Sequence, residues 1–154
     1  MARRFFETSA LVKRYVRETG TSWVERLLVP PLHPTLYIPQ ITGVGTIAAI
    51  TLRTRRGDTT WQEAAAAIAS FRRDYAHVYL LAQVTNSLVA VAMDLAEKHA
   101  LRGYDAVQLS SALQVQSERQ AYDLSSPIFL SADNALNAAA AAEGLAVDNP
   151  NYHA

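Results

Sequence analysis

The sequence predicts an α/β fold in which a mainly parallel sheet of about five strands is covered by helices on both faces. Short apolar runs that suit strands alternate along the chain with longer segments that have helical spacing. No internal repeat and no low-complexity linker interrupts the 154 residues. This length suits one hydrophobic core, so we expect a single domain over residues 1–154.

The strand candidates are five short apolar runs. They read RRFFE (3–7), LYIP (36–39), HVYLL (77–81), PIFLS (127–131) and LAVDN (145–149). Because helical segments separate successive runs, right-handed crossovers are expected and the strands should pair in parallel.

The helix candidates show apolar residues three and four positions apart or strong helix-forming composition. Leu11, Tyr15 and Val16 predict a helix over 9–18, and Trp23, Leu27 and Leu28 predict the next. Four further helices are expected over 60–75, after the turn at 57–58, then over 85–99, over 104–121, and from Asp133 to Gly144.

The stretch ITGVGTIAAI, residues 41–50, is helical in pattern but unusual in its glycines. Thr42 is able to cap the helix, and Ile47 and Ile50 supply apolar positions. Two of the six glycines of the chain, Gly43 and Gly45, nevertheless lie in its first turns. Each costs a helix interior roughly 1 kcal/mol relative to Ala, so helix propensity does not explain them.

Charge and composition exclude several classes of protein. Fourteen basic and fourteen acidic residues give zero formal charge, so any polyanion must meet a local patch. The sequence has no cysteine, which excludes disulfides and thiolate zinc sites. No apolar run approaches the roughly 18 residues of a membrane span. We therefore expect a cytoplasmic protein that has no membrane partner.

Acidic and hydroxyl side chains follow the predicted strands. The first strand ends at Glu7, with Ser9 close behind, and a later strand ends at Ser131, with Asp133 two residues on. Asp105 opens the helix after LRGY. Chemistry in parallel sheets is expected at the carboxyl ends of the strands. The three carboxylates are therefore predicted to meet at one edge, as Mg²⁺ or Mn²⁺ requires, and crowding should raise the pKa of at least one.

Three longer motifs resemble one known family. FFETSALVKRYVRETGTSWV (5–24), LRGYDAVQLSSAL (101–113) and FLSADNALNAAAAAEGL (129–145) resemble PIN domains, specifically the VapC-type ribonuclease toxins of toxin–antitoxin pairs. The motifs occur in the family's order, and the resemblance covers nearly the whole chain. It implies a three-layer α/β/α, Rossmann-like arrangement around the parallel sheet.

The resemblance also implies a set of site residues. PIN nucleases bind one or two divalent ions through four acids, and the matching positions here are Glu7, Gly45, Asp105 and Asp133. Two positions match, one acid is longer by a methylene, and one carboxylate is absent. The implied metal ligands are Glu7, Asp105 and Asp133, and Ser9 and Ser131 are implied to position ligands or substrate.

The implied function is endoribonucleolytic cleavage of RNA that depends on Mg²⁺ or Mn²⁺, by the toxin of a type II pair with a cognate antitoxin. The family commonly forms homodimers. Gly45 leaves three formal negative charges where four are expected, and Glu7 disturbs the octahedral contacts of about 2.1 Å that Mg²⁺ prefers. Activity is therefore expected to be weakened. The alternative is a catalytically inactive PIN domain that acts as an RNA- or protein-binding module.

Structural interpretations compete with these assignments. Asp105 and Asp133 are each well placed to cap a helix. The two basic groups of the sequence suit solvated helix surfaces, with contacts to RNA backbone as the alternative; they are Arg53, Arg55 and Arg56, and Arg72 and Arg73.

A dinucleotide-binding turn is a rival interpretation of GVGTIA, which fits the pattern G-x-G-x-x-A. The fit is weak because residues 39–42 separate the strand from the first glycine. The region where an acid should follow, around Glu63, is predicted to be helical.

Overall fold

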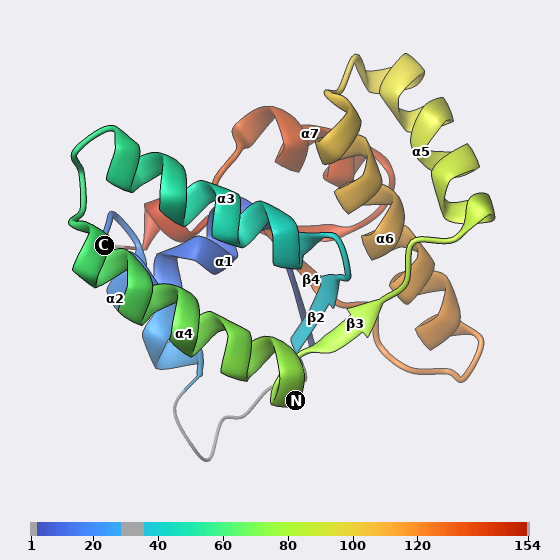
Figure 1. Cartoon of the computed structure of the whole chain (residues 1–154). Coiled ribbons are helices and arrows are strands. Elements are labelled where there is room, and N and C mark those ends of the chain that lie inside the picture. The colour runs from blue at the N-terminus through green and yellow to red at the C-terminus, as the bar shows by residue number, and fades with distance from the viewer. Residues whose placement is uncertain (1–2, 29–35, 154) are drawn as a thin grey trace.

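The computed structural model describes residues 3–28 and 36–153. Its sheet is parallel throughout, with strand order β3-β2-β1-β4-β5 (Figure 1). The strands are β1 (Arg4–Phe6), β2 (Leu36–Pro39), β3 (Leu80–Ala82), β4 (Ile128–Leu130) and β5 (Ala146–Asp148). Four of them lie within predicted runs, and β3 begins in HVYLL and ends one residue beyond it, so the predicted five-stranded parallel sheet is confirmed.

Helices connect the strands as the alternating pattern predicted. They are α1 (Thr8–Leu11), the 3₁₀ turn η1 (Val12–Arg14), α2 (Thr21–Leu27), α3 (Thr42–Arg55), α4 (Trp61–His77), α5 (Asn86–His99), α6 (Gly103–Gln120), α7 (Asn134–Ala142) and the 3₁₀ turn η2 (Pro150–Tyr152). No helix within the described ranges is both long enough and apolar enough to cross a membrane.

The predicted helix over 9–18 is wrong in length, since α1 and η1 together end at Arg14. The buried side chain of Lys13 explains the early end. Its Nζ donates to the carbonyl oxygen of Thr19 at 2.8 Å and pairs with Glu18 at 3.1 Å. Both partners lie beyond the turn that follows η1. These contacts therefore stabilise a chain that turns back after Arg14 and disfavour a helix that continues to residue 18.

Two hydrophobic clusters lie on opposite faces of the sheet and give the fold its three layers. Phe5 and Phe129 belong to a cluster with residues of α5, α6 and α7. Phe6 and Leu130, their neighbours along β1 and β4, belong to a second cluster with residues of α1, α2 and α4. Adjacent strand residues point to opposite faces, so each phenylalanine of FF packs in a different layer.

The pairing of β1 with β4 places the ends of two predicted motifs side by side. Phe6 is in register with Leu130, and the amide of Glu7 donates to the Leu130 carbonyl at 3.0 Å. The amide of Ser131 donates to the carbonyl of Asp148 at 3.2 Å. Glu7 and Ser131 therefore emerge together at the carboxyl edge of the sheet.

Helix starts differ in part from the predicted caps. Asp133 caps α7, since its Oδ1 accepts from the amides of Ala135 and Leu136 at 2.9 and 3.1 Å. Thr42 does not cap α3, because its hydroxyl donates to Oε1 of Gln108 at 3.1 Å. Asp105 does not cap α6 either, as it lies within the first turn and the N-cap is Arg102. A structural cap therefore accounts for Asp133 only.

Candidate functional site

Glu7 is the most enclosed acid at the carboxyl edge, with 4% of its surface exposed. It is the N-cap of α1, and its Oε2 accepts from the amide of Ser9 at 2.9 Å and from the Ser9 hydroxyl. Burial raises the pKa of Glu7, the hydrogen bonds from Ser9 oppose this, and the charge of Asp105 adds a smaller increase. The pKa is thus raised as predicted, but burial outweighs the crowding of acids as its cause.

Two serine hydroxyls connect the ends of β1 and β4. Ser9 Oγ accepts from the amide of Ala132 at 2.9 Å and lies 3.4 Å from Ser131 Oγ. Ser131 Oγ in turn accepts from the amide of Asp133 at 3.0 Å. This network holds the segment that carries Asp133 against the segment that carries Glu7, so both serines position acids.

Asp105 and Asp133 both face the guanidinium of Arg102. Arg102 Nε lies 3.1 Å from Asp105 Oδ2, and a terminal nitrogen of the same group lies 3.7 Å from Asp133 Oδ2. The Arg102 side chain is 83% exposed, whereas those of Asp105 and Asp133 are 14% and 32% exposed. Residues from α6 and from the end of β4 are therefore brought together around one positive charge.

Gly45 lies directly against Tyr104. A Cβ atom at position 45 would be 2.0 Å from the Tyr104 hydroxyl oxygen and 3.2 Å from Thr8 Oγ1. Tyr104 and Thr8 are hydrogen-bonded at 2.8 Å, and Gln108 Nε2 donates to Thr8 Oγ1 at 2.6 Å. The place of the expected fourth acid is thus filled by the tyrosine that precedes Asp105.

Gly43, like Gly45, lies against a tyrosine side chain, in this case that of Tyr75. A Cβ there would lie 2.8 Å from the ring of Tyr75, whose hydroxyl donates to the carbonyl of Gln40 at 3.0 Å. A tyrosine therefore lies against each glycine, at the positions where a dinucleotide-binding turn needs open backbone. This packing explains the glycines of GVGTIA without a bound dinucleotide.

Arg102 and Tyr104 are the residues that sequence reasoning missed. Both lie in LRGYD, immediately before an acid that was identified. Two glycines in the first turns of a helix signalled a close approach, but nothing in the sequence showed which side chain approaches.

The carboxyl edge offers suitable donor atoms for a divalent ion but no preformed group of three ligands among the described residues. Across residues 3–28 and 36–153, no three Asp, Glu or His side chains are arranged closely enough to hold a metal. The donor chemistry does fit, because carboxylate and hydroxyl oxygens are what Mg²⁺ and Mn²⁺ prefer. Asp105 and Asp133 already share the Arg102 guanidinium, so an ion held by both must displace Arg102, and Glu7 does not lie close enough to form a three-acid group with them.

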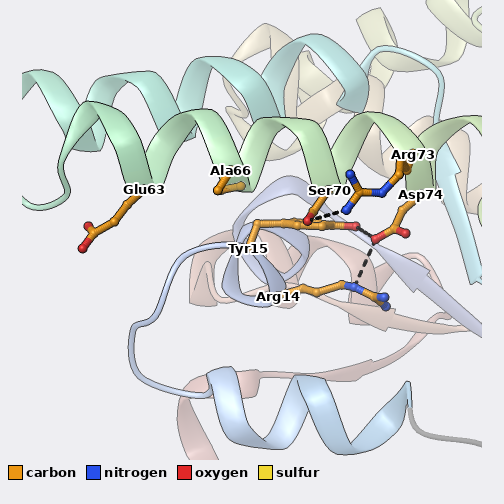
Figure 2. Close-up of a pocket in the computed structure, with 8 residues that line it drawn as sticks. Arg14, Tyr15, Glu63, Ala66, Ser70, Arg73 and Asp74 are labelled. Atoms are coloured by element: carbon orange, nitrogen blue, oxygen red, sulfur yellow. Dashed lines mark hydrogen bonds and ion pairs between the residues drawn. The ribbon is translucent and has the colours of Figure 1, made fainter.

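A pocket of about 480 Å³ lies between η1 and α4 and contains none of the three acids (Figure 2). Five of its polar side chains pair with one another, and Glu63 instead accepts from the amide of Thr60. Tyr15 donates to Asp74 at 2.6 Å, Arg14 pairs with Asp74 at 3.3 Å, and Arg73 donates to Ser70 at 3.0 Å (Figure 2). These pairings are structural, so the carboxyl edge remains the candidate site.

Two solved structures share the fold. The crystal structure of FitAcB from Neisseria gonorrhoeae matches with a TM-score of 0.61 and 15% identity, over 97% of this chain and 99% of that one. The structure of FitAB bound to the IR36 DNA fragment matches with a TM-score of 0.54 and 13% identity, over 95% of this chain and 94% of that one. Neither a protein-family model nor a curated protein matches the chain.

The strand order, the flanking helices and these matches define a PIN-like α/β/α fold, as the three motifs predicted. The predicted resemblance to the VapC-type PIN domains is confirmed at the level of the fold.

Proposed function

We propose that this chain is a VapC-type toxin whose PIN-like domain cleaves RNA weakly, with Mg²⁺ or Mn²⁺ as cofactor. The observation that carries the proposal is the shared positive charge between Asp105 and Asp133, whose Oδ2 atoms both face Arg102. Two acids that arrive from distant parts of the chain surround one cation position beside the end of β1. A purely structural pair of helix starts does not need this convergence.

Each predicted residue has a role in this proposal. Asp105, Asp133 and Glu7 hold the ion, and Ser9 and Ser131 position Glu7 and Asp133 through their hydrogen bonds. When bound, such an ion polarises a phosphate and lowers the pKa of a bound water. Because Tyr104 fills the space beside Gly45, the site has three acids, and we expect weak ion binding and weak cleavage.

The partners in this proposal are an RNA substrate, a cognate antitoxin and a second copy of the chain in a homodimer. FitAB, which shares the fold, is bound to a DNA fragment. We propose that residues 1–154 form a single domain and that the protein acts in the cytoplasm.

The test is an RNA cleavage assay in Mg²⁺, Mn²⁺ and EDTA with the wild-type protein, Asp105→Asn and Arg73→Gln. We expect slow cleavage that is faster in Mn²⁺, is abolished by EDTA and by Asp105→Asn, and is unchanged by Arg73→Gln on α4. Cleavage that survives both EDTA and Asp105→Asn would reject this site.

A second candidate function is an inactive PIN-like domain kept for binding RNA. It is favoured by the pairing of Arg102 with the two remaining aspartates and by Tyr104 in place of a fourth acid. Fluorescence anisotropy with labelled RNA separates the candidates, because RNA binding without cleavage in either metal supports the second and contradicts the first.

A further inference from the structure

We infer that Arg102 is a built-in competitor for the metal position, so that its side chain, as well as the missing fourth acid, sets the affinity of the site for divalent ions. This inference rests on the proposed function. The guanidinium makes its two contacts with Asp105 Oδ2 and Asp133 Oδ2, at 3.1 and 3.7 Å. Oδ2 is the oxygen of Asp133 that remains available, since its other oxygen accepts from two amides of α7.

The charges show why Arg102 competes without closing the site permanently. One guanidinium neutralises one of the two aspartate charges, and a buried third carboxylate, Glu7, lies close enough for Asp105 to influence it. A divalent ion neutralises both aspartates and is therefore favoured over Arg102 in charge. Binding the ion must first break the two Arg102 contacts, which lowers the apparent affinity.

The exposure of Arg102 sets the expected size of this effect. Its side chain is 83% exposed, and ion pairs with such a partner contribute roughly 0–1 kcal/mol. Breaking two contacts and removing a positive charge beside the ion together correspond to an affinity change of about tenfold. The backbone does not need to move, because Arg102 precedes α6 and its side chain makes no capping hydrogen bond.

The experiment is a calorimetric Mn²⁺ titration of the full chain without RNA. The variants are Arg102→Gln, Arg102→Lys, Arg102→Gln with Asp105→Asn, and Arg73→Gln as a control that removes an exposed arginine from α4. We expect Arg102→Gln to bind Mn²⁺ about tenfold more tightly than the wild type. Arg102→Lys should be intermediate because a lysine cannot span both aspartates as the planar fork does. Asp105→Asn should abolish the gain, and Arg73→Gln should match the wild type.

Three results would overturn the inference in distinguishable ways. Equal Mn²⁺ affinity of the wild type and Arg102→Gln, lost in both on Asp105→Asn, leaves the metal site intact and shows that Arg102 does not compete. An absence of Mn²⁺ binding in every variant rejects the metal-dependent function and this inference with it. An equal gain in Mn²⁺ affinity from Arg73→Gln would show that the gain comes from the lower net charge of the protein and not from the position of Arg102. That result would also overturn the inference.

Discussion

Two carboxylate clusters in this molecule look alike in composition and differ in their partners. Asp74 beside the pocket and Asp105 at the carboxyl edge each pair with an arginine, and their side chains are 19% and 14% exposed. Asp74 also accepts from Tyr15, whose hydroxyl is hydrogen-bonded to that of Tyr79, a residue 6% exposed. Asp105 has an arginine partner whose side chain is 83% exposed.

The difference teaches that the burial of an acid does not by itself mark a functional site. Removing Asp74 from Tyr15 would leave an enclosed hydroxyl network short of an acceptor, which costs more than losing a hydrogen bond in water. Arg102 can leave Asp105 and be solvated at once. The carboxyl edge can therefore exchange its cation, whereas the cluster around Asp74 holds α4 against η1 (Figure 2).

The largest expected effect is the loss of stability on Asp74→Ala. This change removes the acceptor of Tyr15 and the partner of Arg14, and we expect the free energy of unfolding to fall by roughly 3 kcal/mol. Asp105→Ala should lower it by less than about 1 kcal/mol, because the lost partner is solvent-exposed. Urea denaturation of both variants measures the difference. Equal losses would remove the distinction between the two clusters.

The next effect appears at alkaline pH. Burial raises the pKa of Tyr79 to about 12, with the hydrogen bond between Tyr79 and Tyr15 and the charge of Arg14 acting against the increase. The unfolded chain releases this proton near pH 10, so the unfolded state binds fewer protons between pH 10 and 12 and stability falls as pH rises. Since one pKa unit corresponds to 1.36 kcal/mol, the two units between pH 10 and 12 correspond to a contribution of about 2.7 kcal/mol.

Tyr79→Phe tests this contribution through its pH dependence. At pH 8 the variant should be less stable by about 1 kcal/mol, because a buried hydrogen bond is lost. The deficit should shrink as the pH rises above 10, since the phenylalanine has no proton to release. Tyr122→Phe, which changes a tyrosine that is 78% exposed, is the matched control and should leave the slope unchanged. A deficit that stays constant up to pH 12 would contradict the assignment.

The sequence was sufficient for the fold because its local signals agree with one another. Because side chains alternate along a strand, Phe5 and Phe129 pack in one layer and Phe6 and Leu130 pack in the other. The parallel pairing follows from the helices that separate successive strands. The places of the three acids in the fold were also predictable, since each follows a strand or opens a helix, and their role as metal ligands stays a prediction.

The partners of those acids were not predictable from the sequence. Arg102 reaches Asp133 across 31 positions of the chain, and Tyr104 fills the space at Gly45 across 59. Such contacts depend on how the starts of α3, α6 and α7 are placed relative to one another and on side-chain rotamers, which leave no periodic signal. The helix over 9–18 was wrong for a similar reason, because the contacts of Lys13 beyond the turn are not visible as a pattern.

The smallest expected effect, and the one whose sign is most informative, concerns Gly45. Gly45→Ala removes a helix-interior glycine, which alone should stabilise the protein by roughly 1 kcal/mol. In the wild type the new Cβ would lie 2.0 Å from the Tyr104 hydroxyl, so the tyrosine must move and lose its bond to Thr8. We therefore expect a net loss of about 1 kcal/mol, and a net gain of similar size when Tyr104→Ala is already present. Gly103→Ala is the control, because a Cβ there meets nothing within 4 Å and its effect should keep one sign in both backgrounds. Urea denaturation of this double-mutant cycle measures the coupling, and a gain from Gly45→Ala in the presence of Tyr104 would contradict the packing.

The same coupling governs any attempt to restore a fourth acid: Gly45→Glu alone must displace Tyr104, so improved Mn²⁺ binding is expected only when Gly45→Glu is combined with Tyr104→Ala.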